Sequence, residues 1–248
     1  MTPRERVEVF HLLFLRTFVA RLENPGLVIL KGGGNLRFFH GSPRFSEDLD
    51  FDVRTIAART LANKVEKTVL ESATFARLLA ARGLAIDRWS APKQTDDVQR
   101  WKISIAEGSG MAEPTKVEFS RRRSGAKGAT EPIPSEALDR HRVPGPILAA
   151  HYGANEAAAQ KIEALVSRAE PQARDVFDLN WLISRGAKLP ALDSRRKKTA
   201  VERALELEAA DFKGQVVAYL DSQEQASWNA QAIEAAQLRV VEAIEGAK

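Results

Sequence analysis

Cysteine is absent from this 248-residue chain, and histidine is scarce. Without cysteine there is no disulfide, no thiolate nucleophile and no Cys-ligated zinc. The four histidines show no paired metal-binding spacing: His11, His40, His141 and His151. Catalysis would therefore rest on carboxylates, lysines or hydroxyls.

Long apolar runs are also missing. No stretch approaches the roughly 18 consecutive apolar residues that span a bilayer. The start, Met1 to Arg6, carries charge but leads into no small-residue cleavage site. We therefore expect a cytoplasmic protein without membrane association. With 44% hydrophobic and 28% charged residues, the chain can bury the core of one or two domains.

The formal charge of +4 is unevenly distributed. Residues 199–248 hold four Lys and Arg against nine Asp and Glu, which leaves a net charge of +9 on residues 1–198. Such a field favours polyanions, meaning nucleic acids or nucleotides. It indicates a class of partner without defining a site, because surface basic residues often serve only solubility.

The first half of the chain alternates helical and strand patterns. Thr2 to Glu5 form a capping box before a helix with apolar residues at helical spacing. A short buried strand is expected at 27–30, and a short helix at 35–40. Thr55 is positioned to cap a long helix that reaches about Ala81.

Three further strands are expected near 85–89, 99–106 and 115–121, which together suggest a mixed sheet. Residues 121–146 are rich in Arg, Gly, Pro and Ser and indicate a boundary or a mobile loop. The remainder is helical, at about 155–168, 172–185, 194–209 and 223–245. We therefore expect an α+β fold, with a core over 1–145 and a helical lobe over 146–248.

Acidic and apolar residues alternate strictly over 48–53. Asp48, Asp50 and Asp52 would point to one side of a strand, and the apolar residues between them to the other. Carboxylates at i and i+2 lie roughly 6 to 7 Å apart at their roots and repel unless cations compensate them. Oxygen ligands suit magnesium or manganese, so Asp48 and Asp50 are candidate metal ligands. The alternative is the polar outer face of an edge strand.

Three consecutive glycines, Gly32 to Gly34, lie between the strand at 27–30 and the helix at 35–40. Such a turn presents backbone N–H groups and a helix N-terminus to a phosphate. Most glycine-rich turns are simply tight turns. This one lies fourteen residues ahead of the acidic pair, so turn and strand can belong to one site.

Two blocks of the sequence resemble a known family, the abortive-infection nucleotidyltransferase toxins of the AbiEii/AbiGii type, which include the MenT toxins. The first block is Lys-Gly-Gly-Gly-Asn-Leu-Arg at 31–37, followed by Arg-Phe-Ser-Glu-Asp-Leu-Asp-Phe at 44–51. The second is Lys-Ile-Glu-Ala-Leu at 161–165 with Arg168, followed by Arg-Asp-Val-Phe-Asp-Leu at 174–179. The resemblance covers roughly residues 25–185.

The resemblance implies a DNA-polymerase-β-like nucleotidyltransferase core joined to a helical lobe. Members are toxins of toxin–antitoxin or phage-defence systems, and some transfer nucleotides to the 3′ end of tRNA. It also implies Mg²⁺ or Mn²⁺ as cofactor, held by Asp48 and Asp50 with Glu118 as a third carboxylate. The residues implied to bind the nucleoside triphosphate are Lys31, Gly32, Gly33, Gly34, Arg44, Ser46, Lys161 and Arg168.

One departure from the family pattern concerns the glycine turn. The family usually has Ser or Thr after its paired glycines, and this chain has Gly34, which lacks the hydroxyl. Ser42 or Ser46 is a candidate substitute. The downstream lysine motif is also looser than in some members, because Leu165 and Val166 follow Lys161. Both differences bear on nucleotide selectivity more than on the reaction class.

The second block places charged residues at helical spacing. Lys161 and Arg168 share a helical face and can reach a common anion. Asp175 and Asp178 border an apolar stripe and need partners, which Arg174, Arg168 or Lys161 can supply. One aspartate would then orient a phosphate-binding basic residue while the other helps to activate the acceptor hydroxyl. The alternatives are a solvated basic face and a purely structural salt-bridge network, and for Glu118 a surface charge ladder.

Two basic stretches can follow an RNA backbone or can be a solvated loop and helix end. They are 121–123 with Lys127, and 195–198. Trp89 and Trp101 are expected in the sheet core. The acidic helical stretch at the C-terminal end can pack on the core, on a second copy or on an antitoxin.

The sequence therefore predicts a metal-dependent nucleotidyltransferase toxin. A 3′-hydroxyl, with tRNA as its favoured source, would attack the α-phosphate of a bound NTP and release pyrophosphate. Two alternatives stay open at this stage. One is a non-catalytic nucleotide- or RNA-binding module with a decayed site, and the other is transfer to a protein or small-molecule hydroxyl.

Overall fold

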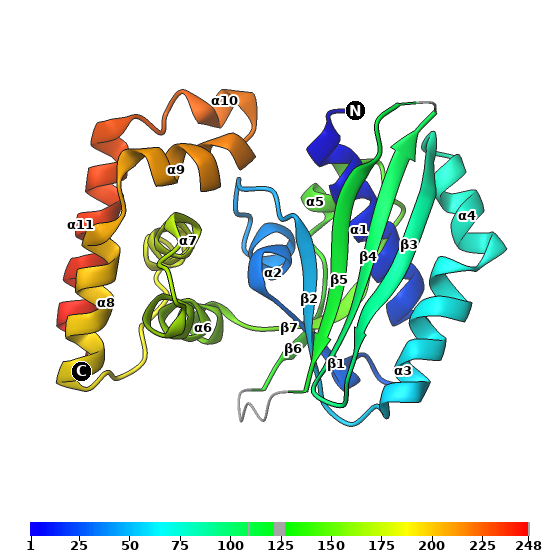
Figure 1. Cartoon of the computed structure of the whole chain (residues 1–248), viewed down its shortest axis with the longest axis horizontal. Coiled ribbons are helices and arrows are strands. Elements are labelled where there is room, and N and C mark those ends of the chain that lie inside the picture. The colour runs from blue at the N-terminus through cyan, green and yellow to red at the C-terminus, as the bar shows by residue number, and fades with distance from the viewer. Residues whose placement is uncertain (109, 122–126, 248) are drawn as a thin grey trace. The chain divides into compact units, whose positions relative to one another are not determined.

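A computed structural model describes residues 1–108, 110–121 and 127–247 of the chain. The chain divides into two compact units. The first contains Met1–Phe39 and Ser46–Tyr152, and the second contains His40–Phe45 and Gly153–Lys248. Figure 1 traces the elements of each unit along the chain.

The first unit is built on helix α1, Pro3–Val19. Its predicted capping box is formed, because Thr2 Oγ1 accepts from the Glu5 backbone N–H and Glu5 Oε2 accepts from the Thr2 N–H. Almost every side chain from Val7 to Phe18 is buried. The Phe18 ring lies 5.3 Å from the ring of Phe119, centroid to centroid, so the helix packs directly on the sheet.

The sheet of the first unit has seven strands in the order β3-β4-β5-β2-β1-β7-β6. Strand β2 lies in the middle, parallel to β5 on one side and antiparallel to β1 on the other. The expected α+β fold with a mixed sheet is therefore confirmed. The strands are β1 Val28–Lys31, β2 Asp48–Val53, β3 Leu84–Gln94, β4 Val98–Glu107, β5 Glu113–Ser120, β6 Ala129–Pro132 and β7 Leu148–His151.

The remaining helices of the first unit are short. They are α2 Gly32–Phe39, α3 Ala58–Val65, α4 Ala73–Ala80 and α5 Ser135–Asp139, with a 3₁₀ turn at Pro25–Leu27 and a π-helical turn at Glu66–Leu70. Phe75 and Leu79 of α4, like Leu61 and Val65 of α3, pack into the same core as α1. The opposite face carries Asp48, Asp50, Glu118 and Arg100 and is named the open face, although over β1 and β7 it buries a small cluster of Ile29, Ala150 and Tyr152.

The single long helix expected from Thr55 to about Ala81 is wrong. The structure has α3, the π-helical turn and α4 in its place. Ser72 interrupts the helical path because its hydroxyl accepts from the Phe75 N–H and caps a new helix. Glu66, at the start of the π-helical turn, is held by the indole N–H of buried Trp101 at 3.0 Å.

Two strands were not expected in the region interpreted as a boundary or loop. Strand β6 pairs antiparallel with β7, which in turn pairs parallel with β1. Both strands have only four residues, and β6 is exposed along its whole length. Neither presents the alternation that reveals a half-buried strand.

The second unit is helical, as expected for the C-terminal region. Its helices are α6 Ala154–Ser167, α7 Ala173–Ile183, α8 Ser194–Glu206, α9 Ala209–Gln215, α10 Ser222–Gln225 and α11 Ala230–Gly246, with a 3₁₀ turn at Val217–Tyr219. The stretch expected as one helix from 223 to 245 is divided, and Asn229 caps α11 by accepting from the Ala232 N–H. None of the helices described is long and apolar enough to cross a membrane.

Candidate active site

The predicted site residues fall into two groups, one in each unit. The first group centres on β2, where Leu49, Phe51 and Val53 enter the hydrophobic core as the alternation predicts. Asp48 and Asp50 are half-buried on the open face of the sheet. Because β2 is a central strand, the alternative of a polar edge strand does not apply.

Asp50 lies in a row of charged residues that crosses four strands. Its backbone partner on β1 is Lys31 and its partner on β5 is Glu118, which faces Arg100 on β4. Within the described part of the chain, the Asp50 carboxylate has no hydrogen bond or ion pair of its own. Burial raises the pKa of Asp50 to about 6, and the charges of Asp48 and Glu118 add to the rise. Lys116 and Lys31 oppose it.

The other two predicted metal ligands face basic side chains. The ammonium of Lys116 lies 2.6 Å from Asp48 Oδ2. The guanidinium of Arg100 lies 2.6 Å from Glu118 Oε2. Lys116 therefore offsets the charge of Asp48, and Arg100 offsets the charge of Glu118. Within the described residues, Asp50 has no such basic partner.

The residues present fit a hard divalent cation by their chemistry, since all three side chains offer carboxylate oxygens only. Over residues 1–108, 110–121 and 127–247, no three His, Cys, Asp or Glu side chains are gathered into a preformed metal cluster. A cation at Asp50 would have to compete with Lys116 for Asp48 and with Arg100 for Glu118. The prediction that Asp48, Asp50 and Glu118 are metal ligands stays a prediction.

The glycine turn lies directly against Asp50. Gly32 has φ +65°, and a β-carbon built on it would be 3.1 Å from Asp50 Oδ2. Helix α2 begins at Gly32 itself, so Gly33 and Gly34 belong to its first turn. The first N–H groups of a helix lack intrahelical partners and suit a phosphate. The turn and the acidic strand therefore belong to one locality.

Two other residues of the first motif hold this turn in place. The side-chain amide of Asn35, fully buried, donates to the Tyr152 carbonyl at 2.9 Å and contacts His151 Nδ1 through its oxygen. Arg37 Nε donates to Glu8 Oε2 of α1 at 2.9 Å, with both side chains buried. The motif thus contains anchors for α2 as well as its glycines.

Lys31 has partners other than Asp50. Its Nζ donates to Asp52 Oδ1 at 2.5 Å and to Ser120 Oγ at 2.6 Å. The Tyr152 hydroxyl donates to the other oxygen of Asp52 at 2.7 Å. This buried cluster ties β1, β2, β5 and the end of β7 together. Sequence reasoning missed Tyr152, because no local pattern connects it with Asp52.

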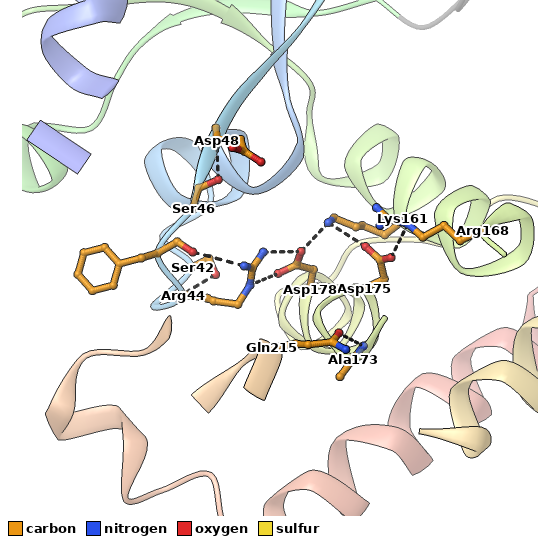
Figure 2. A network of polar contacts seen from close by, with 11 residues as sticks. Ser42, Arg44, Ser46, Asp48, Lys161, Arg168, Ala173, Asp175, Asp178 and Gln215 are labelled. Atoms are coloured by element: carbon orange, nitrogen blue, oxygen red, sulfur yellow. Dashed lines mark hydrogen bonds and ion pairs between the residues drawn. The ribbon is translucent and has the colours of Figure 1, made fainter. Parts of the chain in front are cut away.

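The second group is a chain of alternating charges in the helical unit (Figure 2). Lys161 Nζ lies 3.1 Å from Asp175 Oδ1 and 2.6 Å from Asp178 Oδ2. Arg44 contacts Asp178 through two nitrogens, at 3.3 and 3.1 Å. Arg168 Nε lies 3.1 Å from Asp175 Oδ2. Both aspartates are completely buried.

This network carries three positive charges against two negative ones. Burial alone would raise the pKa of Asp178, but Arg44 and Lys161 outweigh it and hold the pKa below its ordinary value. An ammonium has three hydrogens, and the two aspartates engage two of those on Lys161. The sequence offered Arg174, Arg168 or Lys161 as partners for the acids and assigned Arg44 to the NTP, so the pairing of Arg44 with Asp178 was not expected.

The two serines considered as substitutes for the missing hydroxyl at Gly34 have local contacts. Ser46 Oγ donates to the Asp48 carbonyl at 2.8 Å. Ser42 is buried, and its Oγ accepts from the Arg44 backbone N–H at 3.4 Å. Their proposed contact with a phosphate stays a prediction.

The basic stretches have mixed surroundings. On α8, Arg196 pairs with Glu163, Lys197 donates to the Glu245 carbonyl and Lys198 lies near Glu202, while Arg195 is exposed. Arg121 donates to Gln99 Oε1 at 2.6 Å. Residues 122 and 123 lie outside the described residues. Trp101 is fully buried and Trp89 packs against the core, as predicted.

Solved structures with this fold include two bacterial proteins. MenT4, a nucleotidyltransferase toxin from Mycobacterium tuberculosis, has a TM-score of 0.66 and 16% identity, over 100% of this chain and 87% of that chain. JHP933 from Helicobacter pylori has a TM-score of 0.64 and 19% identity, over 99% of this chain and 91% of that chain. At this identity the likeness concerns the fold. No curated protein sequence matches the chain.

A family model identifies the chain itself. The model described as "Nucleotidyl transferase AbiEii toxin, Type IV TA system" matches residues 13–242. The match includes β2, the glycine turn and the charge network of the helical unit. The chain is a nucleotidyltransferase and belongs to the AbiEii toxin family of type IV toxin–antitoxin systems.

Proposed function

We propose that this toxin uses magnesium or manganese to transfer a nucleotide from an NTP to a hydroxyl of an RNA acceptor in the cytoplasm, with the 3′ end of tRNA as the favoured acceptor. The observation that carries the proposal is the contact between the glycine turn and Asp50. A phosphate at the first turn of α2 would lie beside a carboxylate whose charge is not yet compensated. A divalent cation is what allows the two anions to approach.

Each residue of the first group has a role in this proposal. The N–H groups at the start of α2 would bind phosphate oxygens of the NTP, with no side chain in the way at Gly32. Asp50, with Asp48 and Glu118, would hold the cation. When bound, that cation supplies Lewis-acid stabilisation of phosphate charge and lowers the pKa of the attacking hydroxyl. Lys116 and Arg100, which pair with Asp48 and Glu118, would offset the charge of these two acids when no cation is bound.

We also propose that Lys161 neutralises phosphate charge. Its third ammonium hydrogen and the excess positive charge of its network support this role. Asp175 and Asp178 fix the ammonium from two sides, which limits its freedom before binding. Arg168 is 38% exposed in its side chain and retains further donors for an anion.

Incubation with each of the four labelled NTPs tests the proposal. The acceptors are tRNA, total protein and no acceptor, with magnesium, manganese or EDTA. We expect label on tRNA that depends on the metal, and loss of at least 10³-fold in Asp50→Ala because electrostatic stabilisation is a large catalytic contribution. An exposed acid, Asp87, provides the matched variant Asp87→Ala. Unchanged transfer by Asp50→Ala would refute the assignment.

Gly34 favours a second candidate, a nucleotide- or RNA-binding module without catalysis. The position lacks the hydroxyl that the family pattern usually provides. Calorimetry distinguishes the two, because magnesium-dependent NTP binding with no pyrophosphate release under any acceptor condition supports the binding module. Label on total protein instead of tRNA supports transfer to a protein hydroxyl. Type IV membership also points to a cognate antitoxin.

A further inference from the structure

The open face of the sheet continues the charged row of Asp50 out to the edge strand β3. Glu118 lies opposite Asp50, Arg100 lies opposite Glu118, and Lys93 on β3 lies opposite Arg100. Cross-strand partners share a face, so these four side chains stand on the same side of the sheet. Figure 1 shows β5, β4 and β3 side by side. Three strand spacings, about 14 Å, separate Asp50 from Lys93.

A second row runs parallel to the first. Lys116 lies opposite Asp48, Lys102 lies opposite Lys116, and Ser90 lies opposite Lys102. Arg88 is two residues from Ser90 on β3 and shares its face, because Trp89 between them packs into the core. The open face therefore carries five basic side chains on its three outer strands.

Only two of these five cations are compensated. Arg100 pairs with Glu118 and Lys116 pairs with Asp48. Arg88, Lys93 and Lys102 are exposed, and their side chains have no ion pair or hydrogen bond with the rest of the described chain. An uncompensated basic surface thus begins beside the acidic pair and ends at the edge of the sheet.

We propose that this open face, marked by Arg88, Lys93 and Lys102, binds the phosphate backbone of the acceptor RNA and leads its 3′ end to Asp50. The proposal rests on the proposed function and assigns its acceptor a surface. Backbone contacts by isolated cations give affinity without sequence preference. The tryptophans of these strands, Trp89 and Trp101, pack inward, so the surface offers charge rather than stacking platforms for bases. An acidic protein would fit less well, because the centres of protein interfaces are depleted in charged residues.

Fluorescence anisotropy with an RNA hairpin that carries a single-stranded 3′ end tests this surface. All proteins carry Asp50→Asn, so that binding is measured without transfer. We expect Lys93→Glu/Lys102→Glu to weaken binding at least tenfold. The slope of log affinity against log salt concentration should fall by about 1.4, since each contact with a single strand contributes about 0.7. The milder pair Lys93→Gln/Lys102→Gln should show a smaller loss in the same direction.

The matched control reverses the same charge on the opposite side of the unit. Arg59 on α3 and Arg77 on α4 are exposed, and their helices cover the core face. We expect Arg59→Glu/Arg77→Glu to change RNA affinity less than twofold. Equal losses in both pairs, or unchanged binding after Lys93→Glu/Lys102→Glu, would overturn the proposal.

Failure of RNA binding at the open face can be distinguished from failure of the proposed nucleotide transfer. If the wild-type protein transfers no nucleotide, the anisotropy comparison still tests whether the open face binds RNA. If the open face does not bind RNA, metal-dependent NTP binding measured by calorimetry is unaffected. In the wild-type background, Lys93→Glu/Lys102→Glu should raise KM for RNA at least tenfold and leave the affinity for NTP within twofold.

Discussion

Gly32 lies so close to Asp50 that a β-carbon on the glycine would be 3.1 Å from Asp50 Oδ2. The φ of +65° at Gly32 adds an independent requirement, because L-residues in this region cost about 1 to 2 kcal/mol. Glycine is therefore needed here both for the backbone conformation and for the space beside the acid. The two requirements can be separated by mutation.

Gly32→Ala should lower kcat/KM for NTP at least tenfold, because the new methyl group displaces the carboxylate and narrows the approach to α2. Gly83→Ala is the matched control, since Gly83 has φ +69° and open space around a β-carbon. Both variants should lose similar thermal stability, and only Gly32→Ala should lose activity. Equal activity in the two variants would contradict the proximity argument.

Gly34→Ser supplies the hydroxyl that the family pattern leads us to expect. A β-carbon at Gly34 would lie 3.1 Å from Leu49 Cδ2, the end of a flexible side chain that can shift slightly. We expect a stability loss of about 1 kcal/mol or less. Compared with Gly34→Ala, which adds the same carbon without the oxygen, Gly34→Ser should lower KM for NTP severalfold. Identical KM values for the two variants would show that the hydroxyl makes no contribution to NTP binding.

Asp50→Asn should stabilise the metal-free protein at pH 7.5. The pKa of Asp50 is raised to about 6, so the folded state disfavours its ionised form. The resulting cost is absent below the ordinary pKa near 4, grows as pH rises and is complete above about 6. The rise from 3.8 to about 6 corresponds to about 3 kcal/mol, so removing the charge should add about that much at pH 7.5 and less than about 1 kcal/mol at pH 4.

Thermal unfolding with EDTA at several pH values measures this difference. Asp87→Asn, at an exposed position on β3, serves as the control substitution. Added magnesium should raise the melting temperature of the wild-type protein and not that of Asp50→Asn. A gain in stability that is the same at pH 4 and pH 7.5 would show that charge is not its origin.

Lys161→Met should destabilise the protein by about 3 to 5 kcal/mol, because it leaves two buried carboxylates short of a partner. Arg168→Met should cost much less, since its side chain is 38% exposed. Urea unfolding measures both. Adding Asp178→Asn to Lys161→Met should recover part of the loss, whereas strict additivity would argue against a direct interaction.

Local patterns predicted those parts of the fold that local chemistry determines. The alternation over 48–53 indicated β2 and its buried face, and the capping box at Thr2 indicated the start of α1. The interruption near Ser72 could not be foreseen, because the apolar spacing continues through it. Strands β6 and β7 are stabilised by pairing with distant segments rather than by their own composition.

The residues of the candidate site also separate into those that a local pattern indicates and those that only the fold brings together. The spacing of the acids and the run of glycines are local features, and they were enough to indicate Asp48, Asp50 and Gly32. The partner of Asp48 depends on the parallel register of β2 and β5, which no local pattern specifies. Arg44 and Asp178 are 134 positions apart in the sequence, so their pairing emerges only from the folded helical unit.

The grouping of His40–Phe45 with the C-terminal helices has a practical consequence for dissecting the protein. A fragment that starts at Gly153 would lack Arg44 and would leave the fully buried Asp178 with Lys161 as its remaining cation within the described part of the chain. The complementary fragment would carry a six-residue segment separated from its packing partners. Cleavage at the obvious junction should therefore yield two poorly soluble pieces, and co-expression of both should rescue them.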